Sequence, residues 1–171
     1  MYLMLCAYAG RKVRVIMKRI LVIGVGSILK TDDGIGPRVI DVLEKEDPIE
    51  GVKLERGDLS GMDLLKFFPD FKEVIIVDAA DMGEKPGAVR VFKATEIEPS
   101  AFKDKFSTHG MALLETLTLA RQIEMDTEIT IVGVQPESTE FGLELTPGIK
   151  AKIPFIAGET KKLINAKQHG E

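Results

Sequence analysis

One run of residues constrains the fold of this chain more than any other: EVIIVDAA, residues 73–80. Its four consecutive β-branched residues, without alternation of polar and apolar side chains, indicate a strand that is buried on both faces. Such strands occur in parallel sheets that helices cover on both sides. Two further runs have the same character, ILVIG at residues 20–24 and EITIVGV at residues 128–134. The chain is therefore expected to form an α/β fold around a parallel sheet.

The segments between these strands have the periodicity of helices. Residues 37–46 begin with a proline, which suits a first helical turn, and place an apolar face opposite a charged one. The other elements expected from such signals are helices at 61–68, at 110–123 and from Pro147 onward, and strands at 52–55 and 88–92, the last as an edge strand. Thr146 is the expected N-cap of the last helix. This alternation predicts a mostly parallel sheet between helical layers.

Length and composition fit one globular domain. The 171 residues are 44% hydrophobic and 29% charged, and no repeat, low-complexity segment or long linker divides them. We expect the domain over residues 17–165, because MKRILVIG looks like a natural beginning, and a frayed tail over residues 166–171. Residues 1–16 are either an extension without function or a short amphipathic contact segment. Their apolar run precedes the basic residues, which is the reverse of a secretory signal, and is too short to span a bilayer.

Charge and cysteine content narrow the classes of function. The net charge of −4 argues against nucleic acid as the main partner, because no basic excess neutralises phosphates. Cys6 is the only cysteine, which excludes an internal disulfide and favours a reducing, cytoplasmic compartment. A catalytic cysteine is not expected, since Cys6 precedes Met17. One asparagine and three glutamines beside many Glu and Lys residues suggest a thermophile-like bias.

Three segments carry side chains suited to metal chemistry. Ligands of open α/β sheets bind beyond the carboxyl ends of the strands. Asp32 and Asp33 lie in the glycine-rich loop GVGSILKTDDGIG after the first strand, and Asp78 ends the strand EVIIVD. His109 lies in KFSTHG, just before a predicted helix. Two carboxylates and one imidazole would suit a divalent transition metal ion and leave coordination positions open.

Each of these residues also has a simpler structural interpretation. Asp32 or Asp33, taken alone, is a good helix N-cap. Asp78 risks the cost of a buried charge, but hydrogen bonds from loop amides would satisfy it as well as a metal ion. A single loop histidine such as His109 is more often a helix cap or a surface residue than a ligand. The metal-site hypothesis therefore depends on the coincidence of all three segments.

Other catalytic chemistries fit the sequence less well. The glycine-rich loop matches neither GxGxxG nor GxxxxGK[ST], and its aspartates would repel phosphate. Ser27 or Ser107 with His109 suggests a hydrolase triad, but no GxSxG elbow is present. An aspartate pair that shares a proton, as in aspartic proteases, would have to be Asp33 with Asp78, because adjacent residues seldom point at one atom.

Taken together, the motifs resemble those of the hydrogenase maturation endopeptidases. GVGSILKTDDGIGPRV is similar to their opening motif, usually G-x-G-N-x-L-x-x-D-[DE]-x-[GA]. VIIVDAAD resembles their strand-ending aspartate motif, STHG their histidine loop, and ITIVGVQPES their later G-x-x-P segment. The order is the same from Met17 to the C-terminal helix. Two positions depart: Ser27 replaces the usual Asn, and in ERGDLSG Arg56 stands where a family aspartate falls, with Asp58 nearby but not matching.

The resemblance implies a fold, a reaction and a partner. The fold is a three-layer α/β/α sandwich with a twisted five-stranded sheet. Family members remove a C-terminal extension from the large-subunit precursor of nickel–iron hydrogenases after nickel insertion, and the substrate's nickel is their recognition element. The implied metal-contacting and catalytic residues are Asp33, Asp78 and His109, whereas Asp32 is assigned to the helix start. We expect a cytoplasmic monomer that has no tightly bound cofactor of its own and no membrane or nucleic-acid partner.

Two alternative functions remain open at this point. One is a non-enzymatic maturation chaperone that binds the nickel-bearing precursor without cutting it. The other is a different metal-dependent hydrolase on the same fold, because a fold alone does not fix function. The chemical route is open as well. The metal could polarise the scissile carbonyl or activate a water, or Asp33 or Asp78 could act as general base for that water.

Overall fold

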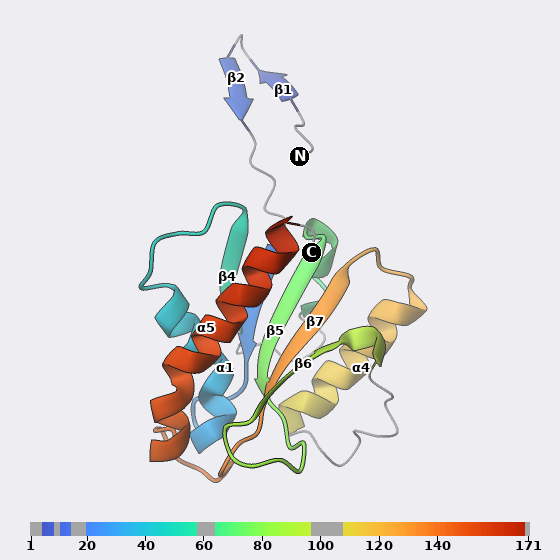
Figure 1. Ribbon diagram of the computed structural model, residues 1–171. Helices are drawn as coiled ribbons and strands as arrows, with labels where there is room; N and C mark the ends of the chain where they lie inside the picture. Colours follow the sequence, from blue (N-terminus) through green and yellow to red (C-terminus); the bar gives the residue numbers. More distant parts are fainter. Residues whose placement is uncertain (1–4, 9–10, 15–19, 58–63, 97–107, 170–171) are drawn as a thin grey trace.

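The structure is a computed structural model that describes residues 5–8, 11–14, 20–57, 64–96 and 108–169, except for the side chains of residues 5–14, 108–112 and 114. A five-stranded sheet forms its centre (Figure 1). The strands are β3 (Ile20–Val25), β4 (Val52–Gly57), β5 (Glu73–Ala79), β6 (Val89–Lys93) and β7 (Glu128–Val134). Their order is β4-β3-β5-β7-β6, and only β6 is antiparallel to its neighbour. This confirms the predicted mostly parallel sheet, with β6 as an edge strand.

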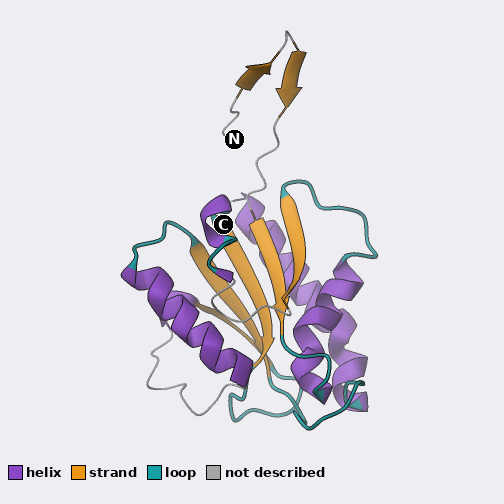
Figure 2. Ribbon diagram, turned by 180° about the vertical axis from the view of Figure 1, so that it is seen from behind, coloured by secondary structure: helices purple, strands orange, loops and turns teal. Residues whose placement is uncertain are grey.

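Helices cover both faces of the sheet, as Figures 1 and 2 show from opposite sides. The helices are α1 (Ile35–Leu43), α4 (Thr108–Gln122) and α5 (Pro147–His169), with short 3-10 helices η1 (Thr31–Gly34), η2 (Phe68–Asp70) and η3 (Ala94–Glu96). Successive strand residues point to opposite faces. Ile75 therefore packs in the core with α1 and α5, whereas its neighbour Ile76 packs with Phe68 and with Leu113 of α4. The three-layer α/β/α architecture is confirmed.

Two predicted helices differ from the observed ones. The helix expected at residues 37–46 begins two residues earlier, because Gly34 is its N-cap. It ends at Leu43, with Glu44 as its C-cap. The helix expected at residues 61–68 lies partly outside the described residues. In its described part Leu64 is helical, residues 65–67 form a turn, and η2 follows; Leu64 and Phe68 are buried against the sheet.

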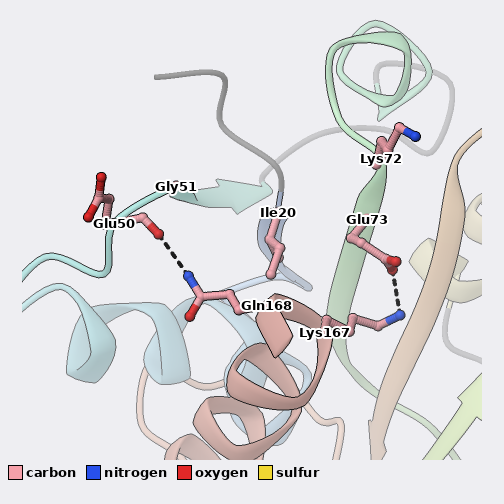
Figure 3. Close-up of a pocket in the computed structure, with 7 residues that line it drawn as sticks. All are labelled: Ile20, Glu50, Gly51, Lys72, Glu73, Lys167 and Gln168. Atoms are coloured by element: carbon pink, nitrogen blue, oxygen red, sulfur yellow. Dashed lines mark hydrogen bonds and ion pairs between the residues drawn. The ribbon is translucent and has the colours of Figure 1, made fainter. Parts of the chain in front are cut away.

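The tail expected to fray from residue 166 is helical as far as His169, so this expectation is wrong. Its last turn is fastened to the amino edge of the sheet. The Lys167 ammonium lies 2.5 Å from a Glu73 carboxylate oxygen and 3.2 Å from one of Glu128. The Gln168 amide donates a hydrogen bond of 2.7 Å to the Glu50 carbonyl. Figure 3 shows the pocket beside this turn, with the Lys167–Glu73 and Gln168–Glu50 contacts.

Replacing Lys167 with methionine is expected to lower the free energy of unfolding by about 1 kcal/mol at neutral pH, because its nearly buried ammonium bridges two carboxylates. The hydrogen bond from Lys167 lowers the pKa of Glu128, so this stabilisation is present above the ordinary carboxyl pKa and disappears as the pH falls through the lowered value. Urea denaturation at pH 7 and pH 3 measures both effects. Lys162→Met, which removes an exposed ammonium from the same helix, is the matched control. An equal loss for both variants would contradict the prediction.

Residues 5–14 include a separate two-stranded sheet. Strand β1 (Leu5–Tyr8) pairs antiparallel with β2 (Arg11–Arg14), with Leu5 opposite Arg14. Neither strand belongs to the five-stranded sheet. Both interpretations of residues 1–16 remain predictions. Within the described ranges, no helix has the length and apolar character needed to cross a membrane.

Candidate active site

The candidate site lies at the carboxyl edge of the parallel strands. Strands β3, β5 and β7 end at this edge, the lower one in Figure 1, and lead into the loops at residues 26–34, 80–88 and 135–146. Helix α4 ends shortly before β7 begins at the opposite edge, so its first turn also lies at the carboxyl edge. The fold therefore brings Asp33, Asp78 and the backbone of His109 to the same edge of the sheet.

Two glycines allow the first loop and α1 to pack directly against the strand ends. A Cβ atom on Gly36 would lie 2.3 Å from the Val25 carbonyl oxygen and 2.4 Å from that of Val77. Only a residue without a side chain permits this close approach of helix to strands. Gly26 has a φ of +125°, and a Cβ there would lie 1.8 Å from the Asp33 carbonyl oxygen. The glycines thus set the position of Asp33 relative to the end of β5.

Asp33 is fully buried within η1. Its Oδ2 accepts a hydrogen bond of 2.8 Å from the Ser27 backbone N–H. Its Oδ1 has no hydrogen-bond partner in the described part of the chain. The hydroxyl of Ser27 accepts a bond of 3.3 Å from the Leu29 N–H, so serine in place of the family's usual asparagine still makes local loop contacts. Asp33 does not cap α1, because the N-cap is Gly34 and no side-chain cap bond is formed.

Asp78 is fully buried at the end of β5. Within the described residues, neither of its carboxylate oxygens has a hydrogen-bond partner. Burial raises the pKa of Asp78 well above its ordinary value, and the negative charge of Asp33 raises it further. The backbone amide of Ala79 offsets only part of this rise, since it does not reach hydrogen-bonding geometry with either oxygen. Asp33 and Asp78 are therefore close enough to interact electrostatically.

The two carboxyl groups together present three buried oxygens without donors among the described residues. Buried polar atoms are nearly always paired, so such a group needs an external cation or a proton. Carboxylate oxygens at the carboxyl ends of the strands are chemically suited to hold a divalent ion. The geometry thus fits the predicted role of Asp33 and Asp78 as metal-contacting residues.

The third predicted ligand is placed by its backbone alone. His109 is the second residue of α4, in the turn at the carboxyl edge, and its side chain lies outside the described part of the structure. The described side chains contain no group of three metal ligands, and His109 is not among them. Its approach to the carboxylates remains a prediction. The other histidine, His169, is at the far end of α5, where its Nδ1 lies 2.7 Å from the Asn165 carbonyl oxygen.

Asp32 has a different role from the one assigned to it at the helix start. It is fully buried, and its carboxylate accepts four hydrogen bonds from the loop at residues 135–146. The donors are the backbone amides of Glu137 at 2.9 Å, Ser138 at 3.0 Å and Thr146 at 2.7 Å, and the Thr146 hydroxyl at 2.9 Å. Asp32 therefore holds two loops together that are more than a hundred residues apart. The helix-start assignment is wrong because these long-range donors use the carboxylate.

Gln135 has a similar connecting role that the sequence analysis missed. Its side-chain carbonyl accepts bonds from the amides of Met82 at 2.7 Å and Glu84 at 3.2 Å, and its amide donates to Asp81 at 3.1 Å. Gln135 thus ties the loop after β5 to the loop after β7. The available signal was a glutamine between a buried strand and Pro136, a position that the strand-end rule would have selected.

Arg56, at the position of a family aspartate, contacts α1. Its guanidinium lies 2.9 Å from an Asp41 carboxylate oxygen and 2.6 Å from one of Glu44. Arg56 therefore links β4 to the acidic face of α1. Asp58, close to it in sequence, lies outside the described residues.

Comparisons with known proteins agree with the motifs. The family model described as hydrogenase maturation protease matches residues 37–162, a range that includes Asp78 and His109 and begins after Asp33. The hydrogenase 2 maturation protease of Escherichia coli strain K12 is 37% identical over 138 residues, which cover 79% of this chain and 84% of that protein. The coenzyme F420 hydrogenase subunit delta of Methanothermobacter thermautotrophicus is 30% identical over 147 residues, covering 79% and 87%.

Solved structures lead to the same family. The hydrogenase maturating endopeptidase HybD from E. coli matches with a TM-score of 0.75 and 34% identity, covering 89% of this chain and 94% of that one. The family model covers most of the chain, and relatives above 30% identity cover most of both lengths. The chain therefore belongs to the hydrogenase maturation protease family, whose members are peptidases.

Proposed function

We propose that this protein is an endopeptidase that removes the C-terminal extension of a nickel–iron hydrogenase large-subunit precursor after nickel insertion. The observation that carries the proposal is the buried pair Asp33 and Asp78 at the carboxyl edge of the sheet. Three of their oxygens have no hydrogen-bond partner in the part of the chain that the structure describes. Family membership supplies the reaction class and the kind of partner. The protein would act in the cytoplasm as a monomer, without a resident cofactor, nucleic acid or membrane.

The nickel ion belongs to the substrate in this proposal. Asp33, Asp78 and His109 would contact a nickel that the precursor already holds, which fixes the scissile bond beside the site and gains the advantage of proximity. Hydrolysis then adds the hydroxyl of a water to the carbonyl carbon and its proton to the departing amine. Either the ion polarises the carbonyl and the water, or one of the two aspartates accepts the water's proton.

The raised pKa of Asp78 suggests how the empty site and the occupied site differ. Without an ion, burial and the Asp33 charge favour a protonated Asp78. A divalent cation would favour the ionised carboxylate and displace that proton, as metal binding generally does. The substrate's nickel would thereby leave Asp78 ionised, the form in which a carboxylate binds a metal ion.

The test is the intact mass of a nickel-loaded large-subunit precursor before and after incubation with the protein. We expect a C-terminal peptide to be lost from the nickel-loaded precursor and not from the metal-free precursor. His109→Ala should reduce processing by at least about a hundredfold, in line with the loss of a ligand or a general acid–base group. His169→Ala is the matched control, because His169 lies at the end of α5, far from the site.

Four outcomes would contradict parts of this proposal. Binding of the genuine precursor without a change of its mass would favour a maturation chaperone. Processing of the metal-free precursor would remove nickel from the recognition step, and a tightly held metal in the isolated protein would favour another kind of metal-dependent hydrolase. Full activity of a folded His109→Ala variant would remove His109 from the mechanism.

A further inference from the structure

Exposed apolar side chains gather on two loops beside the candidate active site. Seven large hydrophobic side chains of the described residues are exposed, and four of them lie in the loops at residues 26–34 and 135–146. These four form what we call the apolar rim: Ile28, Leu29, Phe141 and Leu143, with exposed fractions of 45%, 58%, 85% and 67%. The other three are spread over separate elements. Single exposed apolar residues need no explanation, but a cluster on paired loops does.

The backbone beneath the apolar rim is held in place by many contacts. Lys30 and Phe141 form an antiparallel bridge, and the Gly142 N–H donates a bond of 3.0 Å to the Leu29 carbonyl. The Thr31 hydroxyl donates at 2.7 Å to the Ser138 carbonyl. The four hydrogen bonds accepted by Asp32 join the same two loops. The rim is therefore presented in a fixed arrangement, although its side chains contribute little burial to the fold.

The rim is continuous with the candidate active site. Ile28 follows Ser27, whose backbone N–H binds the Asp33 carboxylate at 2.8 Å. The Cα atom of Ile28 lies 3.4 Å from the point where a Cβ on Gly34 would sit. The first and last parts of this loop therefore pack on each other. A folded protein that brings a peptide bond to Asp33 would therefore approach the loop that carries Ile28 and Leu29.

We propose that the apolar rim is the surface on which the hydrogenase large-subunit precursor docks, through an apolar patch of its own next to the segment to be cut. This inference rests on the proposed function. A stable protein–protein contact buries on the order of 1,200 to 2,000 Å², far more than a scissile segment and a metal ion supply. Aromatic side chains such as Phe141 commonly provide most of the binding energy in such contacts.

A cation–π contact supports Phe141 as the main anchor. The Lys30 ammonium lies 6.0 Å from the centre of the Phe141 ring and limits the positions that the ring adopts. A partly oriented ring loses less conformational entropy on binding than a free one. The single change Phe141→Ser should therefore affect docking more than Leu143→Ser, because it removes the larger and more exposed side chain.

The test measures processing kinetics and affinity for the nickel-loaded precursor. Phe141→Ser is expected to raise KM and Kd by about tenfold or more, with kcat changed less than about twofold and an unchanged thermal midpoint, because the ring is exposed. Phe155→Ser is the matched control. It removes a phenylalanine that is 58% exposed on α5, outside the two loops, and should leave KM and Kd unchanged.

The outcomes separate this inference from the proposed function. Absence of processing by the wild-type protein would overturn the proposed function whatever the variants do. Processing by the wild type, with KM and Kd of Phe141→Ser within twofold of the wild-type values, would overturn the docking surface alone. Light scattering tests whether the apolar rim instead binds a second copy of this chain. A wild-type dimer that Phe141→Ser converts to a monomer, with KM unchanged, would assign the rim to that second copy and overturn the inference.

Discussion

Replacing Asp78 with asparagine is expected to abolish precursor processing and, at neutral pH, to make the folded protein more stable. Asp78 is fully buried, its oxygens have no hydrogen-bond partner among the described residues, and the Asp33 charge acts on it. An amide has nearly the same shape, carries no charge and brings two donors that can face the Asp33 carboxylate. We expect processing to fall by at least about a thousandfold, since the amide can neither accept a proton nor replace a carboxylate ligand.

The stability gain should depend on pH in a defined direction. The pKa of Asp78 is raised in the folded state, so between the unfolded value of about 3.9 and the raised value the folded protein binds more protons than the unfolded one. The wild-type stability therefore falls as the pH rises through this window, because the carboxyl group of Asp78 loses its proton more readily in the unfolded chain. Asparagine does not titrate and removes this dependence.

Urea denaturation of wild type and Asp78→Asn at several pH values measures the effect. The difference in unfolding free energy should grow as the pH rises above about 4 and reach about 1 to 2 kcal/mol, the scale of a buried group that lacks a partner. A difference that stays constant across pH would show that Asp78 is not forced to bind a proton in the folded state. A folded Asp78→Asn variant that processes precursor at the wild-type rate would remove Asp78 from the mechanism.

Replacing Asp32 with alanine is expected to lower the free energy of unfolding by about 3 to 5 kcal/mol. The carboxylate accepts four hydrogen bonds of 2.7 to 3.0 Å from the loop at residues 135–146. Hydrogen bonds to a charged group contribute about 1.5 to 3 kcal/mol each, but they are not additive, and water can reach part of this loop. Asp47→Ala is the matched control, because Asp47 is exposed and a change there should stay within about 0.5 kcal/mol.

The loss should be concentrated in the loop that carries part of the apolar rim. Hydrogen exchange of the Glu137, Ser138 and Thr146 amides, which bind Asp32, should speed up far more than exchange in β5. Processing should show a higher KM for the precursor, because Phe141 and Leu143 would no longer be held beside the site. Unchanged exchange at these three amides would contradict the connecting role of Asp32.

The layers of the fold and the edge that carries the site could be predicted from the amino-acid sequence alone. Unbroken apolar runs in β3, β5 and β7 specify burial on both faces, and this property depends only on each strand's own residues. Asp78 could be selected as a candidate because a charge at the end of such a strand is costly wherever the strand lies. The motif order was sufficient to identify the family. These features are local, so a linear sequence expresses them directly.

The different roles of the adjacent residues Asp32 and Asp33 could not be predicted from the sequence and become visible in the folded chain. Asp32 and Asp33 share one loop and the same cap-like local signature. Yet Asp32 binds a loop more than a hundred residues away, whereas the charge of Asp33 acts on Asp78. The helical end of α5 was missed for the same reason, because Lys167 meets its carboxylate partners only after the sheet has formed. Local pattern fixes whether a segment is a strand or a helix, whereas the partner of a polar side chain depends on which distant segments the finished fold brings within hydrogen-bonding distance.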